Sequence, residues 1–333
     1  MSSDAIFSPL AIAPMIDWTN THFRVLMRLI APKALLYTEM QTPGAIRHKP
    51  ERALGFDACE QPLALQLGGS VPEVLAECAR IAEEKGFAEV NLNLGCPSDR
   101  VLAGRFGACM MQEPQLVSEC IAAMKEAVSI PVSAKTRIGI DLQDSYEFFA
   151  QFAEKIISAG ADKLIIHARK AWLHGLNPKQ NRTIPPINYD YVYRLKKEFS
   201  TVPVIVNGNI STISAIESHL EHVDGVMLGR LACDNPYALA EIHRRIYPDI
   251  LISSRFVIFQ KYSDYAKAQL DKSVPLSVLL KPVFNLCHGQ PGNKQWKALL
   301  QSMLQNKDAS LLDIAAEWLA NQGCVKTEQE EMC

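Results

Sequence analysis

The chain has 333 residues, of which 48% are hydrophobic and 21% charged, so it can bury a large core and has the composition of an ordinary globular protein. Its net charge of −2 gives no global sign of a nucleic-acid or membrane partner, and no DNA partner is expected. The nine cysteines are odd in number and include no Cys-x-x-Cys pair, which argues against a disulfide framework and a zinc site. We therefore expect a cytoplasmic protein with reduced thiols, no membrane segment and no bound metal.

Eight short apolar runs recur along the first three quarters of the chain. The runs are Leu10–Met15, Ala34–Met40, Leu63–Gly68, Glu89–Gly95, Val132–Arg137, Lys163–Ala168, Val204–Asn207 and Gly225–Gly229. Helical patterns between them include Val71–Lys85, Pro114–Val128, Ser145–Ser158, Tyr189–Phe199 and Ser211–Leu220. The expected helix N-caps are Asp144 and Ser211, and the expected helix stops are Gly86 and Gly160. Eight apolar strands alternating with helices predict an α/β fold, a (β/α)8 TIM barrel rather than an open sheet.

The alternation of strands and helices ends at about Tyr247. Helical patterns then run through Ser254–Leu270, Val274–Phe284, Asn293–Gln305 and Ser310–Asn321. We therefore predict a barrel domain over residues 1–246, followed by a smaller α-helical C-terminal domain over residues 247–333.

Polar side chains follow the predicted strands at their carboxyl ends. They are Glu39, Gln66, Asn93 with Cys96, Lys135, His167, Asn207 and the Gly229-Arg230 pair. A barrel gathers these ends in one mouth, where the active sites of this architecture lie. The turns Asn207-Gly208-Asn209 and Gly229-Arg230 would expose backbone N–H groups to an anion, and the arginine adds a bidentate donor. The two turns predict a phosphate site, with plain turns as the alternative.

The most informative segment runs from Glu89 to Pro97. It puts the amides of Asn91 and Asn93 on one side of a strand and the thiol of Cys96 just past the strand's end. A strand-end thiol beside amides is a candidate reactive centre, whereas a small buried thiol filling a gap is the alternative.

Three other strand-end residues are candidates for contact with a cofactor. Lysines are rarely buried without a partner, so Lys135 could offset negative charge on a ligand; a surface lysine is the alternative. His167 could serve the same anion or act as a structural hydrogen-bonder. Gln66 offers both a donor and an acceptor to the edge of a heterocycle.

Residues 163–197 form a basic segment, with eight lysines and arginines against the single acid Asp190. Trp172 and two histidines are interleaved with these cations. Aromatic rings among cations at a pocket rim suit a nucleic-acid backbone with a stacked base, so we expect polyanion contact over Arg169–Arg182. A solvated helix face is the interpretation favoured for Arg194–Lys197.

Together these motifs resemble those of the tRNA-dihydrouridine synthase family. The matching motifs are Ala13-Pro14-Met15 with Asp17, Gln66-Leu67-Gly68-Gly69, Asn91 through Pro97, Gly107-Ala108, Lys135-Thr136-Arg137-Ile138-Gly139, His167-Ala168-Arg169 and Asn207-Gly208-Asn209-Ile210. The stretch Asn177 through Arg182, with Ile184-Pro185-Pro186, further resembles the A-type bacterial branch, whose members act on D-loop uridines 20 and 20a.

The resemblance implies a barrel that binds FMN and a helical domain that helps to bind tRNA. The implied flavin contacts are Ala13, Pro14 and Met15 along the ring, Gln66 at its pyrimidine edge, Lys135 and His167 at its anionic side, and Asn207, Gly208, Asn209, Gly229 and Arg230 at the phosphate. The implied tRNA contacts are Asn93, Lys179, Gln180 and Arg182, with Arg137 and Arg169 as further candidates. Cys96 would be the catalytic acid.

The implied reaction saturates the C5–C6 bond of a D-loop uridine. Reduced flavin supplies hydride to C6, and a thiol, which is mostly protonated at neutral pH, is suited to protonate C5. No Gly-x-Gly-x-x-Gly follows any strand, so NADPH is expected to act transiently at the flavin face, with ping-pong kinetics. We expect a monomer with tRNA as its partner.

Two other functions are left open by the sequence. One is a metabolic FMN-dependent barrel dehydrogenase or ene-reductase, and the other is a non-catalytic RNA-binding barrel. The sequence does not decide which uridine is reduced or whether NADPH is preferred over NADH, and it gives no role to Glu39 or Cys109.

Overall fold

Eight parallel strands form a closed barrel, in which each strand pairs with the next and β8 pairs with β1. The computed structural model describes residues 8–330, and side chains for residues 8–322. The strands are β1 (Leu10–Ile12), β2 (Leu35–Tyr37), β3 (Leu63–Leu67), β4 (Glu89–Leu94), β5 (Val132–Arg137), β6 (Lys163–His167), β7 (Val204–Asn207) and β8 (Gly225–Leu228). The predicted (β/α)8 barrel is therefore confirmed, and each of the eight predicted runs contains a strand.

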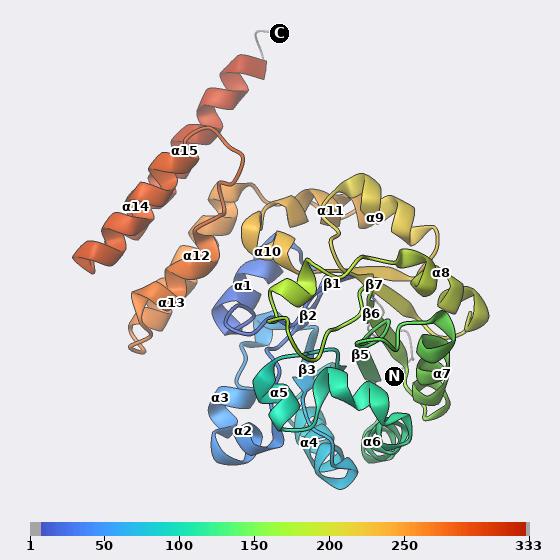
Figure 1. Cartoon of the computed structure of the whole chain (residues 1–333). Helices are drawn as coiled ribbons and strands as arrows, with labels where there is room; N and C mark the ends of the chain where they lie inside the picture. Colours follow the sequence, from blue (N-terminus) through green and yellow to red (C-terminus); the bar gives the residue numbers. More distant parts are fainter. Residues whose placement is uncertain (1–7, 331–333) are drawn as a thin grey trace. The chain divides into compact units, whose positions relative to one another are not determined.

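Helices and short 3-10 turns connect the strands, and Figure 1 shows the longer helices arranged around the barrel. The connecting elements are α2 (Pro43–His48), α3 (Pro50–Leu54), η1 (Ala58–Glu60), α4 (Pro72–Glu84), α5 (Asp99–Ala103), η2 (Gly107–Gln112), α6 (Pro114–Ala127), α7 (Tyr146–Ser158), η3 (Gln180–Arg182), α8 (Tyr189–Glu198) and α9 (Ile213–Leu220).

The helix ends follow local chemistry. Gly86 and Gly160 adopt φ values of +88° and +95° just past α4 and α7, so the predicted glycine stops are confirmed. The predicted N-caps were wrong by one residue, because the hydroxyls of Ser145 and Thr212 accept the N–H groups of the first turn. The carboxylate of Asp144 instead accepts from Lys170 at 2.6 Å.

The chain forms two compact units, one containing the barrel and the other helical. The barrel unit joins the chain up to Thr19 with Ala34–Gly229, and the helical unit joins Asn20–Lys33 with the chain from Arg230 onward. The helical unit contains α1 (Thr21–Ile30), α10 (Arg230–Asp234), α11 (Ala238–Ile246), α12 (Arg255–Leu270), α13 (Leu276–Leu280), η4 (Lys281–Val283), α14 (Asn293–Asn306) and α15 (Leu311–Glu330). The prediction, in contrast, places the division between residues 246 and 247.

The helical unit has its own apolar core. Helix α12 packs against α1 and α15, and the fully buried Trp296 of α14 meets Phe259 at a ring-centroid distance of 4.9 Å. The indole N–H of Trp296 donates to the Val283 carbonyl at 3.0 Å, so this large side chain is buried with its polar atom satisfied. Within residues 8–330, no helix is both long and apolar enough to cross a membrane.

The interior of the barrel is divided between apolar and polar side chains. The apolar part is a buried cluster of Ala11, Ala13, Leu35, Tyr37, Ala64, Ile165, Ile205 and Met227. The polar part centres on β4, whose Glu89, Asn91 and Asn93 share one side because strand residues alternate in direction. The register pairs Asn91 with Gln66 of β3 and with Ser133 of β5. We call these five side chains the polar column.

Candidate active site

The thiol of Cys96 lies on an ordered turn two residues past β4. The side-chain oxygen of Asn93 accepts the N–H groups of Gly95 and Cys96 at 3.1 and 3.0 Å, and the carbonyl of Cys96 accepts from the Ala108 N–H at 2.9 Å. The half-buried thiol donates to the Ser98 hydroxyl at 3.4 Å. The predicted reactive cysteine is therefore held by backbone hydrogen bonds on both sides of its residue.

Gly107 allows the following segment to return to Cys96. It adopts φ +75°, and an added β-carbon would lie 2.6 Å from the Cys96 carbonyl oxygen. Only glycine fits both the conformation and the space. Cys109 follows in η2, where its thiol donates to the Phe106 carbonyl at 3.2 Å and burial raises its pKa.

Lys135 stands beside Asn93 in the β4–β5 register, and its ammonium donates to the side-chain oxygen of Asn207 at 3.1 Å. The Asn207 amide donates in turn to the Met227 carbonyl at 2.8 Å. Burial lowers the pKa of Lys135 to about 7, repulsion from Arg137 adds to the shift, and the Cys96 thiol opposes it. A negatively charged ligand beside this ammonium would raise the pKa again.

His167 ends β6 and is almost fully buried. Burial lowers its pKa well below the usual value, and the charges of Arg137, Lys135, Arg169 and Arg182 lower it further. The imidazole is therefore neutral at physiological pH. The charges that act on it are all positive, so this part of the mouth is suited to an anion.

The turn after β7 approaches His167 as closely as a glycine allows. Gly208 has φ +121°, and an added β-carbon would lie 2.7 Å from the His167 ring. Asn209 is also left-handed at φ +54°, a conformation that asparagine tolerates. The Tyr189 hydroxyl holds the turn by donating to the Gly208 carbonyl at 2.6 Å.

The other predicted phosphate turn follows β8. A β-carbon added to Gly229 would lie 3.8 Å from both Ala13 and Met15, so these predicted flavin contacts are neighbours of the turn. Pro14 is half-buried between them in sequence. Arg230 is exposed and begins α10, the first element after Gly229 in the helical unit.

Arg137 connects the Cys96 turn to the loop after β6. Its guanidinium donates to the carbonyls of Gly95 at 2.8 Å, Lys170 at 3.0 Å and Asn181 at 3.0 Å. The fully buried side chain of Asn181 accepts the Trp172 N–H at 2.8 Å and donates to the carbonyls of Trp172 and Leu176. The loop is thus fixed from inside by one arginine and one asparagine.

The predicted tRNA contacts fall into two groups. Lys179, Gln180 and Arg182 are exposed on or next to η3. Arg137 and Arg169 are buried, and Arg169 donates to the Pro185 carbonyl. The side chain of Asn93 is committed to Gln66 and to the Cys96 turn.

Several residues of the site escaped the sequence patterns. Lys163 belongs to the basic segment of residues 163–197, but it is buried and its ammonium lies 2.5 Å from Glu89. Its charge is therefore used inside the barrel, and the expected polyanion contact over Arg169–Arg182 does not include it. Side chains alternate between the two faces of β4, so Glu89 is on the same face as Asn91 and Asn93. This alternation is the sequence pattern that could have placed Glu89 in the site. Glu39 is half-buried after β2, and its backbone carbonyl accepts from Gln41 at 3.3 Å.

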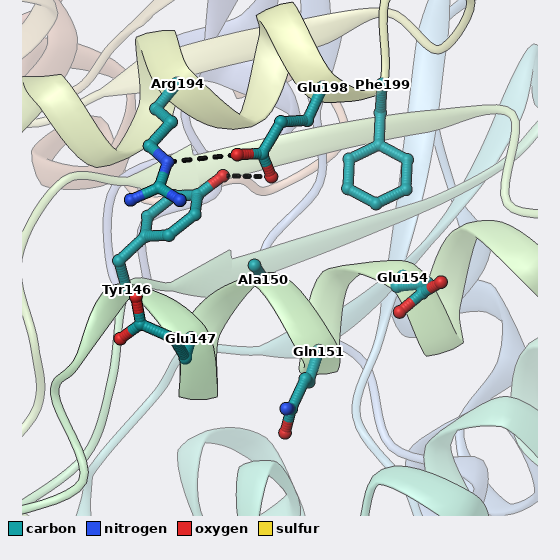
Figure 2. A pocket seen from close by; sticks show the side chains of 8 residues that line it. All are labelled: Tyr146, Glu147, Ala150, Gln151, Glu154, Arg194, Glu198 and Phe199. Carbon is teal, nitrogen blue, oxygen red and sulfur yellow. Dashed lines mark hydrogen bonds and ion pairs between the residues drawn. The ribbon is translucent and has the colours of Figure 1, made fainter.

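A separate cavity of about 260 Å³ lies on the outer side of the barrel, between α7 and α8. Figure 2 shows Tyr146 and Arg194 both reaching Glu198 there, at 2.6 and 3.0 Å. None of the strand-end residues lines this cavity. Among residues with described side chains, no group of three or more histidines, cysteines and acids is placed to hold a metal ion.

The fold and the site define a parallel (β/α)8 barrel protein whose mouth combines one ordered thiol with amides and cations. Residues 11–322 match the model of the dihydrouridine synthase (Dus) family, and the chain belongs to this family. It is 49% identical over 294 residues to the tRNA-dihydrouridine(20/20a) synthase of Xanthomonas campestris pv. campestris, covering 87% of each chain. It is 46% identical over 319 residues to the protein of the same name from a Synechocystis species, covering 95% of this chain and 96% of the relative.

Among solved structures, an oxidized active mutant of (S)-mandelate dehydrogenase overlaps 73% of this chain and 74% of its own. The TM-score is 0.46 and the sequence identity 16%, too low to bear on function.

Proposed function

We propose that this chain reduces the C5–C6 double bond of uridine 20 or 20a in the D-loop of tRNA, giving dihydrouridine. The observation that carries the proposal is the ordered Cys96 thiol next to Lys135 and Asn93 at the barrel mouth. Membership of the dihydrouridine synthase family and the names of the relatives support it.

The donors at the mouth fit FMN, the cofactor that the family implies. The set is rich in cations and amides, and Gly208 lets a turn lie against His167, so a ligand with a phosphate and a polar ring edge is matched in charge and hydrogen bonding. The proposed contacts are Ala13, Pro14 and Met15 on the ring, Gln66 at its pyrimidine edge, Lys135 and His167 at its anionic side, and Asn207, Gly208, Asn209, Gly229 and Arg230 at the phosphate. When bound and reduced by NADPH, FMN supplies the hydride that C6 of uracil receives.

Cys96 holds the proton that C5 of uracil receives. The S–H bond breaks, a C5–H bond forms, and the thiolate left behind regains a proton from solvent. The charges of Lys135 and Arg137 interact with that of Cys96, so they are placed to stabilise the thiolate until it is protonated.

The exposed Lys179, Gln180 and Arg182 are the proposed direct contacts with tRNA, because solvent-facing cations and amides can reach phosphates. Arg137, Arg169 and Asn93 act from beneath, nearer the target base, which must leave its stack to enter the mouth. The helical domain of residues 247–333 would add further RNA contact, and the enzyme would act as a cytoplasmic monomer.

Nucleoside mass spectrometry tests the proposal. Unmodified tRNA incubated with the purified protein and NADPH should gain two hydrogens on a D-loop uridine. Replacing the proton donor, Cys96→Ala, should slow this gain by about a hundredfold or more. Cys109→Ala is the matched control and should keep the wild-type rate, because its thiol donates to the Phe106 carbonyl and takes no part in the hydrogen bonds that hold Cys96.

Other outcomes favour the other functions. Reduction of small enones without any effect on tRNA would indicate a metabolic flavin enzyme. Tight tRNA binding with no gain of hydrogen in the wild type would indicate a non-catalytic RNA-binding barrel.

A further inference from the structure

One continuous series of hydrogen bonds runs through the polar column to the Cys96 turn. The Ser133 hydroxyl donates to Glu89, and the Asn91 amide donates to Ser133 Oγ at 2.7 Å. The Gln66 amide donates to Asn91 Oδ1 at 2.8 Å, and the Asn93 amide donates to Gln66 Oε1 at 2.8 Å. The backbone N–H groups of Gly95 and Cys96 donate to Asn93 Oδ1 at 3.1 and 3.0 Å. Glu89, Asn91, Gln66 and Ser133 are each at most 1% exposed, so water does not compete for the bonds among these four side chains.

The two ends of the series fix its direction. A carboxylate can only accept, so the single Ser133 proton points to Glu89, and the hydroxyl oxygen is left to accept from Asn91. At the other end, backbone N–H groups can only donate, so Asn93 must present its oxygen to the turn and its amide nitrogen to Gln66. Each intervening amide therefore has one orientation that satisfies both neighbours.

Glu89 is anchored independently of this series. The Lys163 ammonium lies 2.5 Å from one carboxylate oxygen, and the Tyr37 hydroxyl donates to the other at 2.8 Å. The charge of Glu89 is thus compensated inside the barrel, and its carboxylate cannot turn away from Ser133 without losing these partners.

Stability alone does not require polar groups here. The apolar cluster in the same barrel is made of alanine, leucine, isoleucine and methionine with a single tyrosine. Apolar side chains of similar volume can replace a buried ion pair at little or no cost in stability. What the polar column provides, and an apolar interior would not, is a fixed Asn93 side chain that orders the Cys96 turn.

We propose that Glu89 is a positioning residue for Cys96, acting through Ser133, Asn91, Gln66 and Asn93. The direction of the series makes Asn93 hold the Cys96 turn, and it gives the Gln66 amide a single orientation between Asn91 and Asn93. This role rests on the proposed function, since it takes Cys96 as the proton donor.

Two variants that each delete one hydroxyl group test the proposal. The hydroxyls of Ser133 and Tyr37 each donate one hydrogen bond to the same oxygen of Glu89. Ser133→Ala interrupts the series, whereas Tyr37→Phe removes a hydroxyl that contacts Glu89 and Ser133 but leaves every donor and acceptor of the series in place. The readout is the rate of Cys96 alkylation by iodoacetamide as a function of pH, followed by peptide mass spectrometry. We expect Ser133→Ala to change this rate by about threefold to tenfold, the effect of one lost hydrogen bond, and Tyr37→Phe to leave it within about twofold.

Equal effects of the two variants, or none in Ser133→Ala, would overturn the positioning role. Ser133→Thr keeps the hydroxyl and should restore the wild-type alkylation profile. Alkylation needs neither tRNA nor turnover. Failure of the proposed function, shown by tRNA that gains no hydrogen with the wild-type protein, is therefore distinguishable from failure of the positioning role. So is failure of the proton-donor role, shown by full uridine reduction in Cys96→Ala.

A second measurement needs no variant. Hydrogen exchange of the Gly95 and Cys96 amides in the wild-type protein should be slower than in an unprotected peptide by about a hundredfold or more. Unprotected exchange at both amides would mean that Asn93 does not hold the turn, and would overturn the proposal even if Ser133→Ala failed to fold.

Discussion

At the scale of single residues, Lys135 shows a conflict between stability and binding. Burial lowers the pKa of its ammonium to about 7 from an ordinary 10.5, with Arg137 adding to the shift. Between these two pH values the unfolded chain carries a proton that the folded protein releases, so stability rises with pH through this window. Below about pH 7 the folded protein carries the full cost of a buried charge.

Lys135→Met should therefore stabilise the cofactor-free protein while impairing the reaction. We expect the free energy of unfolding at pH 6 to rise by about 1–2 kcal/mol, and the gain to shrink as the pH is raised towards 10. Urea titrations at several pH values measure the gain, and uridine reduction should fall at least about tenfold. A variant less stable than the wild type at pH 6 would contradict this account of Lys135.

At the scale of elements, the loop between β6 and α8 owes its order to side chains beneath it rather than to the residues it exposes. Asn181 binds both the N–H and the carbonyl of Trp172, while Arg137 holds the Asn181 carbonyl. This arrangement presents Lys179, Gln180 and Arg182 to solvent as one group. RNA contact and loop order can therefore be separated by mutation.

Two substitutions in this loop should weaken tRNA binding in different ways. Lys179→Ala removes a phosphate contact, so the slope of log K against log salt should fall by about one. Asn181→Ala removes three side-chain hydrogen bonds and no charge, so affinity should fall about tenfold with the slope nearly unchanged. Filter binding across a salt series measures both. Wild-type affinity in Asn181→Ala would show that the loop is ordered without it.

At the scale of the whole molecule, buried histidines occur in both units. Burial is the largest cause of the lowered pKa of His167 and His219 in the barrel unit, and of His22 and His243 in the helical unit. Below pH 6.5 the unfolded chain binds protons that the folded protein does not, so stability falls as the pH drops. The window for His243 extends down to about pH 4.

We expect His243→Gln to reduce this acid sensitivity. The glutamine oxygen can accept the Lys33 N–H that His243 Nε2 accepts at 3.0 Å, but the side chain does not titrate. The loss of unfolding free energy between pH 7 and pH 5 should shrink by an amount on the order of 1 kcal/mol, measured by urea unfolding. If the loss of unfolding free energy between pH 7 and pH 5 were the same in His243→Gln, the other histidines would account for the acid sensitivity.

How much the sequence predicted depended on whether a feature is local. The strands and the glycine helix stops follow from short-range patterns, and the strand-end position of Cys96 followed from the same patterns. The structural role of Asn181 could not be predicted, because the sequence around a loop asparagine does not show whether its side chain is exposed or fully buried. The partnership of Glu89 with Lys163 and Ser133 required the register of β4, β5 and β6, which is a property of the closed barrel.

Helix α1 lies between β1 and β2 in the chain but belongs to the helical unit, where it packs against α12. During synthesis its apolar face, which includes Phe23, Leu26 and Ile30, therefore leaves the ribosome long before the helix that covers it. The apolar residues of α1 therefore stay exposed until the C-terminal helices have been synthesised. Trimming those helices would thus expose α1 as well, so the two units cannot be exchanged or deleted as independent cassettes.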